Sequence, residues 1–456
     1  MISRPFCVKL VRSDGPPAGR RRPDYGGAMM RNYIGFLKAV EGASGVKAWL
    51  VGESARMIEM GIRPKIMTLA LDARDLEGVA SALGNGKLDL RGPHPVLRGE
   101  MMGVPFRAFS LQGDTIEEDL ARRDLSIEAF ALRSDGGTVD PFGGKLDIRN
   151  HTIRLTGDDV ELIRTDPLRI VRMLRFAAEL EMSIFWKTDT DVRDFLRDGA
   201  EAMKAIPAER WGNEILKGMA RHPWRFISLC DAYGLLPFFI EELDVLKTVS
   251  DGKGRTIFDH VMGTLAVIQS RLDTHKVMQR DSFVLAGLFC HIGDRGTKAS
   301  REKADRAMAE RLARWNIPSD TIAEVSSILD GYASFYRPIS EEGFCTAILK
   351  HGMEAMDVGL GFAVCIDIAE GTSHDDVLEA NRWSLDQVLR RFRSVASQTD
   401  GTATRFLTGD EVMRILQMPP GRKVGELLKG LDMAVGTGKV GNRAAAEAWL
   451  IRNASA

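Results

Sequence analysis

Four short segments of the sequence carry side chains suited to binding phosphates and bases. The first is an apolar run that turns through small residues into a helical pattern, a geometry in which backbone amides can hold phosphate oxygens. The others combine paired arginines and carboxylates with a turn rich in glycine. In chain order the segments are Trp49–Arg56, Glu117–Ile127, Asp140–Gly144 and Asp166–Phe176.

The last segment places three arginines at a constant spacing. Arg169, Arg172 and Arg175 recur every third residue, so a helix presents them as one stripe that could meet phosphates or bases. Pairing with neighbouring carboxylates is the alternative, and the sequence leaves it open.

The elements around these segments predict an α+β fold. Strands are expected at Ala48–Gly52, Ile66–Leu71, Val104–Leu111 and Leu125–Leu132, with a helix near Ala55–Met60. After about residue 157 helical periodicity dominates. We therefore expect a small α/β head domain followed by an extended all-helical neck, body and tail.

Composition shifts divide the chain into five predicted parts. Residues 1–28 form a disordered basic arm, for which RNA binding is an alternative; 29–150 form the head; 151–250 form a helical neck that binds RNA; 251–398 form a further helical domain; and 399–456 form a helical tail.

Bulk composition limits the classes of function. The 456 residues hold 62 Lys and Arg against 63 Asp and Glu, so any RNA binding must come from a local patch. The five cysteines lack CxxC spacing, which favours a reducing cytoplasm over a disulfide framework. No apolar run is long enough to span a membrane and no secretory signal is present, so we expect a cytoplasmic protein without a membrane partner.

In their order and spacing, the four segments resemble the class II tRNA nucleotidyltransferases and poly(A) polymerases. The head domain of that family carries GGxVRD, EDLxRRD, DPFGG and EDPLRxxRxxRF in this order. The resemblance continues through Pro207–Arg210 and Leu407–Leu428, and it covers the chain from about Tyr33 to Leu450.

The resemblance implies two sets of site residues. The positions expected to bind nucleotide are Gly52, Arg56, Arg123, Asp124, Asp166, Arg169 and Arg172. The positions expected to bind RNA, with tRNA as the expected partner, are Arg175, Arg210 and Lys217. An active member would use Mg²⁺ with CTP or ATP.

The carboxylates that hold Mg²⁺ in the family are replaced here. The DxD positions fall on Ile66 and Thr68, and the third acid aligns with Arg107. Neither isoleucine nor threonine coordinates Mg²⁺ as a carboxylate does, and arginine repels it. We therefore expect no catalytic residue, no metal ligand and no cofactor.

Other departures lie in the same motifs. Glu53 replaces the second glycine of GGxVRD, where it would repel a triphosphate, and Met57, Glu128 and Thr165 also differ from the family pattern. Asp72 and Asp75, with Glu53, are an alternative set of carboxylates that could hold the metal ion in place of the family's acids.

The third predicted domain resembles the HD phosphohydrolase domain fused to some relatives, also with altered ligands. His260 fits the first ligand, but Cys290 and His291 occupy the HD pair, Asp294 replaces a lysine, and Asp330 lies near the place of a later histidine. Zinc binding by His260, Cys290 and His291 is one interpretation; a packed helical domain with incidental polar residues is the other.

Three hypotheses follow. The leading one is an RNA-binding family member that has lost nucleotidyl transfer. The alternatives are an active CCA- or A-adding enzyme with relocated carboxylates, and a scaffold that pairs with an intact paralogue or a second copy of itself.

Overall fold

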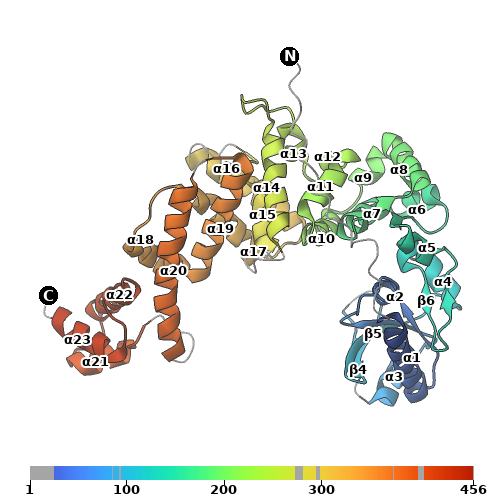
Figure 1. Cartoon of the computed structure of the whole chain (residues 1–456), viewed down its shortest axis with the longest axis horizontal. Helices are drawn as coiled ribbons and strands as arrows, with labels where there is room; N and C mark the ends of the chain where they lie inside the picture. The colour runs from blue at the N-terminus through green and yellow to red at the C-terminus, as the bar shows by residue number, and fades with distance from the viewer. Residues whose placement is uncertain are drawn as a thin grey trace. The chain divides into compact units, whose positions relative to one another are not determined.

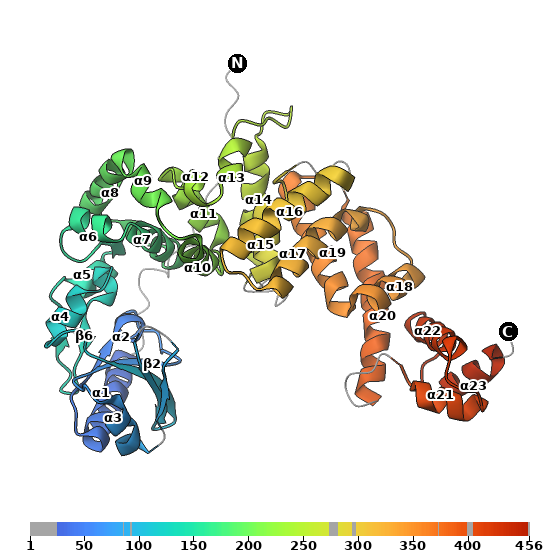
Figure 2. The same cartoon turned by 180° about the vertical axis from the view of Figure 1, so that it is seen from behind.

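The computed structural model describes residues 25–84, 86–91, 94–272, 281–293, 298–372, 374–398 and 405–454 (Figures 1 and 2). The chain divides into two compact units, the first made of residues 1–169 and 182–195 and the second of residues 170–181 and 196–456.

Helix α1 (Tyr25–Ser44) opens the first unit. Most of the predicted basic arm lies outside the described residues, so its disorder stays a prediction, and the last four residues of its predicted range, 25–28, are the start of α1. Burial of Phe36, Leu37 and Val40 anchors the helix. Extending an existing helix costs little compared with starting one, so two glycines near its start do not end it.

A seven-stranded mixed sheet in the order β3-β4-β5-β2-β1-β6-β7 forms the core of the head. β1 pairs antiparallel with β2, and β2 pairs parallel with β5. The strands are β1 (Ala48–Val51), β2 (Met67–Leu71), β3 (Lys87–Asp89), β4 (Val96–Met101), β5 (Val104–Ser110), β6 (Ala131–Leu132) and β7 (Thr138–Val139). The predicted strands β1, β2 and β5 are confirmed.

The predicted strand Leu125–Leu132 was wrong over most of its length. A 3₁₀ turn, η1 (Ser126–Glu128), replaces it, and only β6 is extended. The Ser126 hydroxyl donates to Asp147 at 2.5 Å, and its amide donates to the carbonyl of Arg154 at 2.9 Å. Hydrogen bonds of Ser126 therefore replace strand pairing at the start of this buried apolar segment.

The two faces of the sheet carry different layers. Helices α1 and α3 (Leu76–Leu83) contact each other, α2 (Gly52–Glu59) contacts β1 and β2, and Phe36 of α1 lies edge-on to Phe106 of β5. On the opposite face, α4 (Ile116–Ala121) packs Ile116 and Leu120 against Val51. Side chains alternate along a strand, so Thr68 and Arg107 share this second face.

The first unit ends in short elements that surround the Asp140–Gly144 turn. They are α5 (Gly144–Arg149), β8 (Thr152–Ile153), α6 (Asp159–Thr165), β9 (Ser183–Ile184) and the start of α8 (Trp186–Asp198). Asp140 accepts hydrogen bonds from the amides of Gly144 and Lys145 at 2.7 and 3.0 Å, which starts α5.

Gly144→Ala is expected to destabilise the head by about 1–3 kcal/mol, the usual cost of overpacking. A Cβ at this position would lie 1.9 Å from the carbonyl oxygen of Ser126. Thermal unfolding measures the effect. Gly42→Ala in α1 is the control, since no atom lies within 4 Å of its added Cβ and alanine favours the helix. Equal melting temperatures for the two variants would contradict the prediction.

The second unit is helical, which confirms the predicted α+β architecture. Its helices are α7 (Leu168–Glu179), the end of α8, α9 (Ala200–Lys204), α10 (Ala208–Met219), α11 (Pro223–Ala232), α12 (Leu236–Phe239), α13 (Glu241–Leu246), α14 (Ile257–Arg271), α15 (Asp281–Phe289), α16 (Lys298–Arg314), α17 (Ser319–Gly331), η3 (Tyr332–Tyr336), α18 (Glu341–His351), α19 (Met353–Glu370), α20 (Asp375–Gln398), α21 (Gly409–Leu416), α22 (Arg422–Gly436) and α23 (Arg443–Asn453). Among the described helices, none is both long and apolar enough to cross a membrane.

Candidate functional site

Arg107 occupies the face of the sheet on which the family motif would place its acids. In the register of β2 and β5, Thr68 lies opposite Arg107. The Nε of Arg107 donates to the Thr68 hydroxyl at 3.0 Å, and its Nη2 lies 3.2 Å from a carboxylate oxygen of Glu53. The guanidinium thus bridges Thr68, at a DxD position, and Glu53, at the second glycine of GGxVRD.

The start of β2 is tied to α2 through Ser54. The Ser54 hydroxyl accepts from the amide of Thr68 at 2.7 Å and donates to the carbonyl of Ile66 at 3.0 Å. Ser54 is fully buried and Thr68 nearly so, whereas Ile66 is 47% exposed. The two former DxD positions are therefore held in place without offering a carboxylate.

The glycine of the first motif is required by close packing with the second motif. Gly52 has a φ of +57°, and a Cβ added to it would lie 2.9 Å from Nη1 of Arg123. The other terminal nitrogen of Arg123 lies 2.9 Å from Asp119, which is buried. The structure thus brings together Gly52 and Arg123, two of the predicted nucleotide-binding residues.

Arg56, another predicted nucleotide-binding residue, forms an ion pair with Glu128. Nε of Arg56 lies 3.0 Å from a Glu128 oxygen, and the two side chains are 10% and 24% exposed. Glu128 is one of the residues that depart from the family pattern. The carboxylate that departs from the family pattern is therefore the one that engages Arg56.

The remaining predicted nucleotide-binding residues of the first unit lie around the end of α6. Asp124 pairs with Arg169 at 3.2 Å. Asp166 ends α6 and accepts from the amide of Leu168 at 3.3 Å. The stripe of arginines begins here in an ion pair.

In the second unit the stripe converges on one buried carboxylate. Glu214 of α10 lies 2.8 Å from Arg175, 3.3 Å from Lys217 and 3.6 Å from Arg172. Arg175, only 13% exposed, also pairs with Glu179 at 3.0 Å. The pairing that the sequence left open is what the structure shows, and direct contact of Arg172, Arg175, Lys217 and the half-buried Arg210 with a ligand stays a prediction.

The charges around Glu214 determine its protonation. Burial alone would raise the pKa of this carboxyl, but Arg175, Lys217 and Arg172 outweigh it and lower the pKa. Burial would lower the pKa of Arg175, but the carboxylates of Glu179 and Glu214 outweigh it and raise the pKa. Both groups are charged at neutral pH, so the cluster is a buried ionic network.

The side chains at the family's metal positions do not fit Mg²⁺. Magnesium in proteins takes oxygen ligands, mainly carboxylates, and the side chains at these three positions are a hydroxyl, an alkyl chain and a guanidinium. The one neighbouring carboxylate described above, Glu53, is paired with Arg107. Asp72 follows the far end of β2, about 13 Å from Thr68 at the usual rise of a strand, and Asp75 caps α3. Within the described ranges, no three His, Cys, Asp or Glu side chains form a group that could hold a metal ion.

The HD-like segment places its two histidines near each other. The rings of His260 and His291 lie 5.7 Å apart, and each faces a carboxylate: His260 lies 3.1 Å from Asp251, and His291 lies 3.5 Å from Glu370. The thiol of Cys290 donates to the carbonyl of Gly287 within α15. Asp294 lies outside the described residues, and Asp330 lies in α17.

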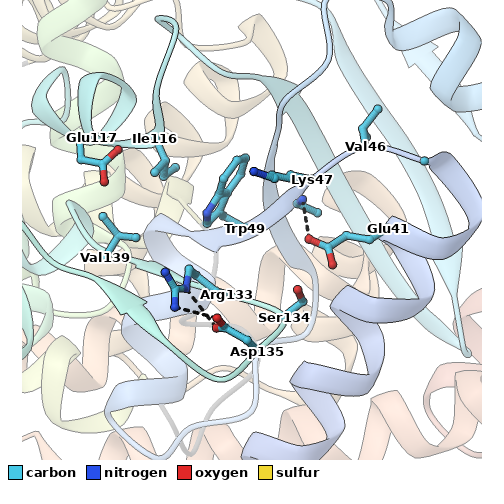
Figure 3. Close-up of a pocket in the computed structure, with 12 residues that line it drawn as sticks. Glu41, Val46, Lys47, Trp49, Ile116, Glu117, Arg133, Ser134, Asp135 and Val139 are labelled. Carbon is cyan, nitrogen blue, oxygen red and sulfur yellow. Dashed lines mark hydrogen bonds and ion pairs between the residues drawn. The ribbon is translucent and has the colours of Figure 1, made fainter.

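A pocket of about 550 Å³ in the head lies away from this site (Figure 3). Its lining includes the apolar Trp49, Ile116 and Val139 and the charged Lys47 and Glu117. Trp49 lies at the start of β1 and Gly52 directly after its end, about 10 Å further along the strand. The pocket therefore does not belong to the cleft around Arg107.

Comparison with known proteins identifies the family. The sequence profile of the poly A polymerase head domain matches residues 43–154. The A-adding tRNA nucleotidyltransferase of Deinococcus radiodurans is 26% identical over 357 residues, which span 74% of this chain and 79% of that protein. Residues 43–154 therefore belong to the poly A polymerase head domain family, and the chain as a whole is similar to the class II tRNA nucleotidyltransferases.

Further relatives agree with this family. The multifunctional CCA protein of Chromobacterium violaceum is 39% identical over 133 residues, an overlap of 29% of this chain and 31% of that protein. The Bacillus stearothermophilus CCA-adding enzyme in complex with CTP has the same fold, with a TM-score of 0.54, 20% identity and coverage of 93% of this chain and 97% of that one. The Thermotoga maritima CCA-adding enzyme complexed with tRNA-CCA also has a TM-score of 0.54, at 16% identity and coverage of 93% and 95%.

Three site residues were missed by sequence reasoning. Ser54, Asp119 and Glu214 fix β2, Arg123 and the arginine stripe respectively. Ser54 and Asp119 lie inside the family motifs and could have been singled out as buried polar positions. The partnership of Glu214 with Arg175 spans 39 residues and leaves no local signal.

Proposed function

We propose that this chain binds tRNA or a similarly structured RNA and no longer transfers nucleotides. The position of Arg107 carries the proposal. Its guanidinium contacts Thr68 and Glu53 where the family motif would place carboxylates around Mg²⁺. A fixed positive charge in that position repels a divalent cation.

Changes at the nucleotide-binding positions also support the loss of transfer. Glu128 engages Arg56, and Glu53 adds a carboxylate directly after Gly52. A carboxylate about 5 Å from a triphosphate oxygen costs roughly 3 kcal/mol at an effective dielectric near 20. Glu53 is compensated by Arg107, so the pair is neutral and offers no net attraction to either a metal or a phosphate.

The RNA partner is supported by the relatives. One is named as a tRNA nucleotidyltransferase, and another has been solved with tRNA. The helical unit carries exposed cations that could contact phosphates, among them Lys217, which is 58% exposed. We place the protein in the cytoplasm, since its four described cysteines are free and buried. Pairing with a second copy or an intact paralogue stays a prediction.

Incorporation of radiolabelled ATP or CTP into tRNA lacking its 3′ end tests the loss of transfer. Three missing electrostatic stabilisers of about 3 kcal/mol each would slow the reaction by roughly six orders of magnitude, although such contributions are not additive. The Deinococcus enzyme is the positive control. Mg²⁺-dependent extension at a comparable rate would instead support the hypothesis of relocated carboxylates.

RNA binding is tested separately by mobility shift across a salt series. Contacts with phosphates predict an affinity that falls steeply as salt rises. Absence of any salt-dependent binding would contradict the RNA-binding half of the proposal, whatever the transfer assay shows.

A further inference from the structure

A pocket of about 340 Å³ lies in the helical unit, away from the residues discussed above. It forms where the chain leaves α7, where α11 begins, and along the last turn of α14. Its lining combines an indole, a cation, an imidazole and an amide. The residues are Glu181, Arg221, His222, Trp224, Ala266, Gln269 and Ser270.

The polar groups of this pocket are only partly engaged by the protein. The side-chain oxygen of Gln269 accepts from the amide of Arg225 at 3.2 Å, which leaves its NH₂ group as the donor that it can offer. Nδ1 of His222 is enclosed and has no hydrogen-bond partner among the described residues. Arg221 is exposed and forms no ion pair with a described carboxylate.

The charge balance favours an anionic ligand. Arg221 and Arg225 lie near His222, and Glu181 and Glu179 oppose them, but Glu179 is engaged by Arg175. Burial lowers the pKa of His222, so its ring is neutral and can donate or accept a hydrogen bond. Glu181 alone offers a carboxylate that could accept from a hydroxyl or an amino group.

We propose that this pocket binds one unpaired nucleotide of an RNA, with its base stacked on Trp224 and its phosphate at Arg221. An indole face accepts any base, and an arginine beside it holds the backbone, which is the usual combination in single-strand recognition. The carboxylate of Glu181 suits the ribose 2′-hydroxyl, which DNA lacks. The volume lies in the range of small-ligand sites. This inference rests on the proposed RNA-binding function.

Affinity for a tRNA transcript, measured by fluorescence anisotropy on the full chain, tests the proposal. Trp224→Ala is expected to weaken binding about tenfold, because a stacked base contributes about 1–3 kcal/mol. Trp224→Phe keeps an aromatic face and should lose less than about threefold on the same grounds. Arg221→Ala should make the plot of log affinity against log salt concentration less steep, by the amount expected for the loss of roughly one phosphate contact.

The matched control is Trp383→Ala in α20, because Trp383 is 61% exposed and does not line the pocket. Its affinity should equal that of the wild type. Cross-linking of RNA that contains 4-thiouridine, followed by peptide mapping, should place the label on the peptide that contains Trp224. A melting temperature equal to that of the wild type shows that a variant is folded. If Trp224→Ala does not fold, the cross-link on the wild-type protein still tests the site.

The outcomes separate the two proposals. In one outcome the wild type binds RNA while Trp224→Ala and Arg221→Ala keep the same affinity and the cross-links fall on other peptides. That result overturns this inference and leaves the RNA-binding function intact. No salt-dependent binding by the wild type overturns both. Equal affinity for a DNA strand of the same sequence would overturn the role of Glu181.

Discussion

Glu214→Gln is expected to lower the free energy of unfolding of the helical unit by about 3–5 kcal/mol, the usual cost of removing one partner from a buried ion pair. The carboxylate is 7% exposed and lies within 3.6 Å of three cations. Glutamine keeps the shape but leaves Arg175 with Glu179 alone. Differential scanning calorimetry of the full chain would show the transition of this unit at lower temperature.

The same network makes stability depend on pH. The pKa of Glu214 is lower in the folded chain than in the unfolded chain, so its stabilising contribution is present at neutral pH and is lost as the pH falls below the ordinary range for glutamate. The difference in melting temperature between wild type and Glu214→Gln should therefore narrow on acidification. A constant difference between pH 7 and pH 3 would contradict the assignment.

Glu209→Gln is the matched control. Glu209 lies in the same helix, α10, and is exposed. Exposed carboxylates typically contribute less than about 1 kcal/mol. A loss of stability as large as that of Glu214→Gln would mean that α10 tolerates no change of charge, and the role given to the buried network would be wrong.

A second large effect is expected from rebuilding the carboxylates of the cleft. The variant combines Glu53→Gly, Ile66→Asp, Thr68→Asp and Arg107→Glu. Removal of the guanidinium relieves roughly 7 kcal/mol of its own repulsion on a divalent ion at about 5 Å, for an effective dielectric near 20 and before the opposing charge of Glu53 is counted. We expect Mn²⁺, as a probe for Mg²⁺, to bind the variant at least about 100-fold more tightly than the wild type, a difference near 3 kcal/mol.

Isothermal titration with Mn²⁺ measures this gain. The control carries Ile66→Asn and Thr68→Asn in place of the two aspartates, with the other changes kept, so that shape is retained and the charge is withheld. Equal Mn²⁺ affinity in the two variants would show that the cleft does not bring these positions together. Tight binding by the wild type would contradict the effect assigned to Arg107.

Much of the head could be predicted from sequence because its strands are short apolar runs with clear boundaries. Once β2 and β5 are recognised as neighbours, the alternation of side chains places Thr68 and Arg107 on one face, and the structure shows them in contact. Strand β4 was not predicted, since Arg98, Gly99 and Glu100 interrupt the apolar pattern on a strand with exposed positions.

The partners of the arginines could not be predicted in the same way. Carboxylates are common near every arginine of the motifs, and spacing does not distinguish Glu128 from other acids as the partner of Arg56, 72 residues away. The same holds for the start of α1, where buried residues downstream outweigh a glycine pair in the local sequence. Long-range packing determines both results.

The two ion pairs of the cleft make the departures from the family pattern depend on one another. Glu53→Gly alone removes the carboxylate that faces Arg107, and Arg107→Glu alone sets a second anion beside Glu53. Likewise, Glu128→Asn alone removes a carboxylate that pairs with Arg56. Each single change to the family residue would leave a charge without one of its partners, so the family pattern can be restored without such a step only by changing both members of a pair together.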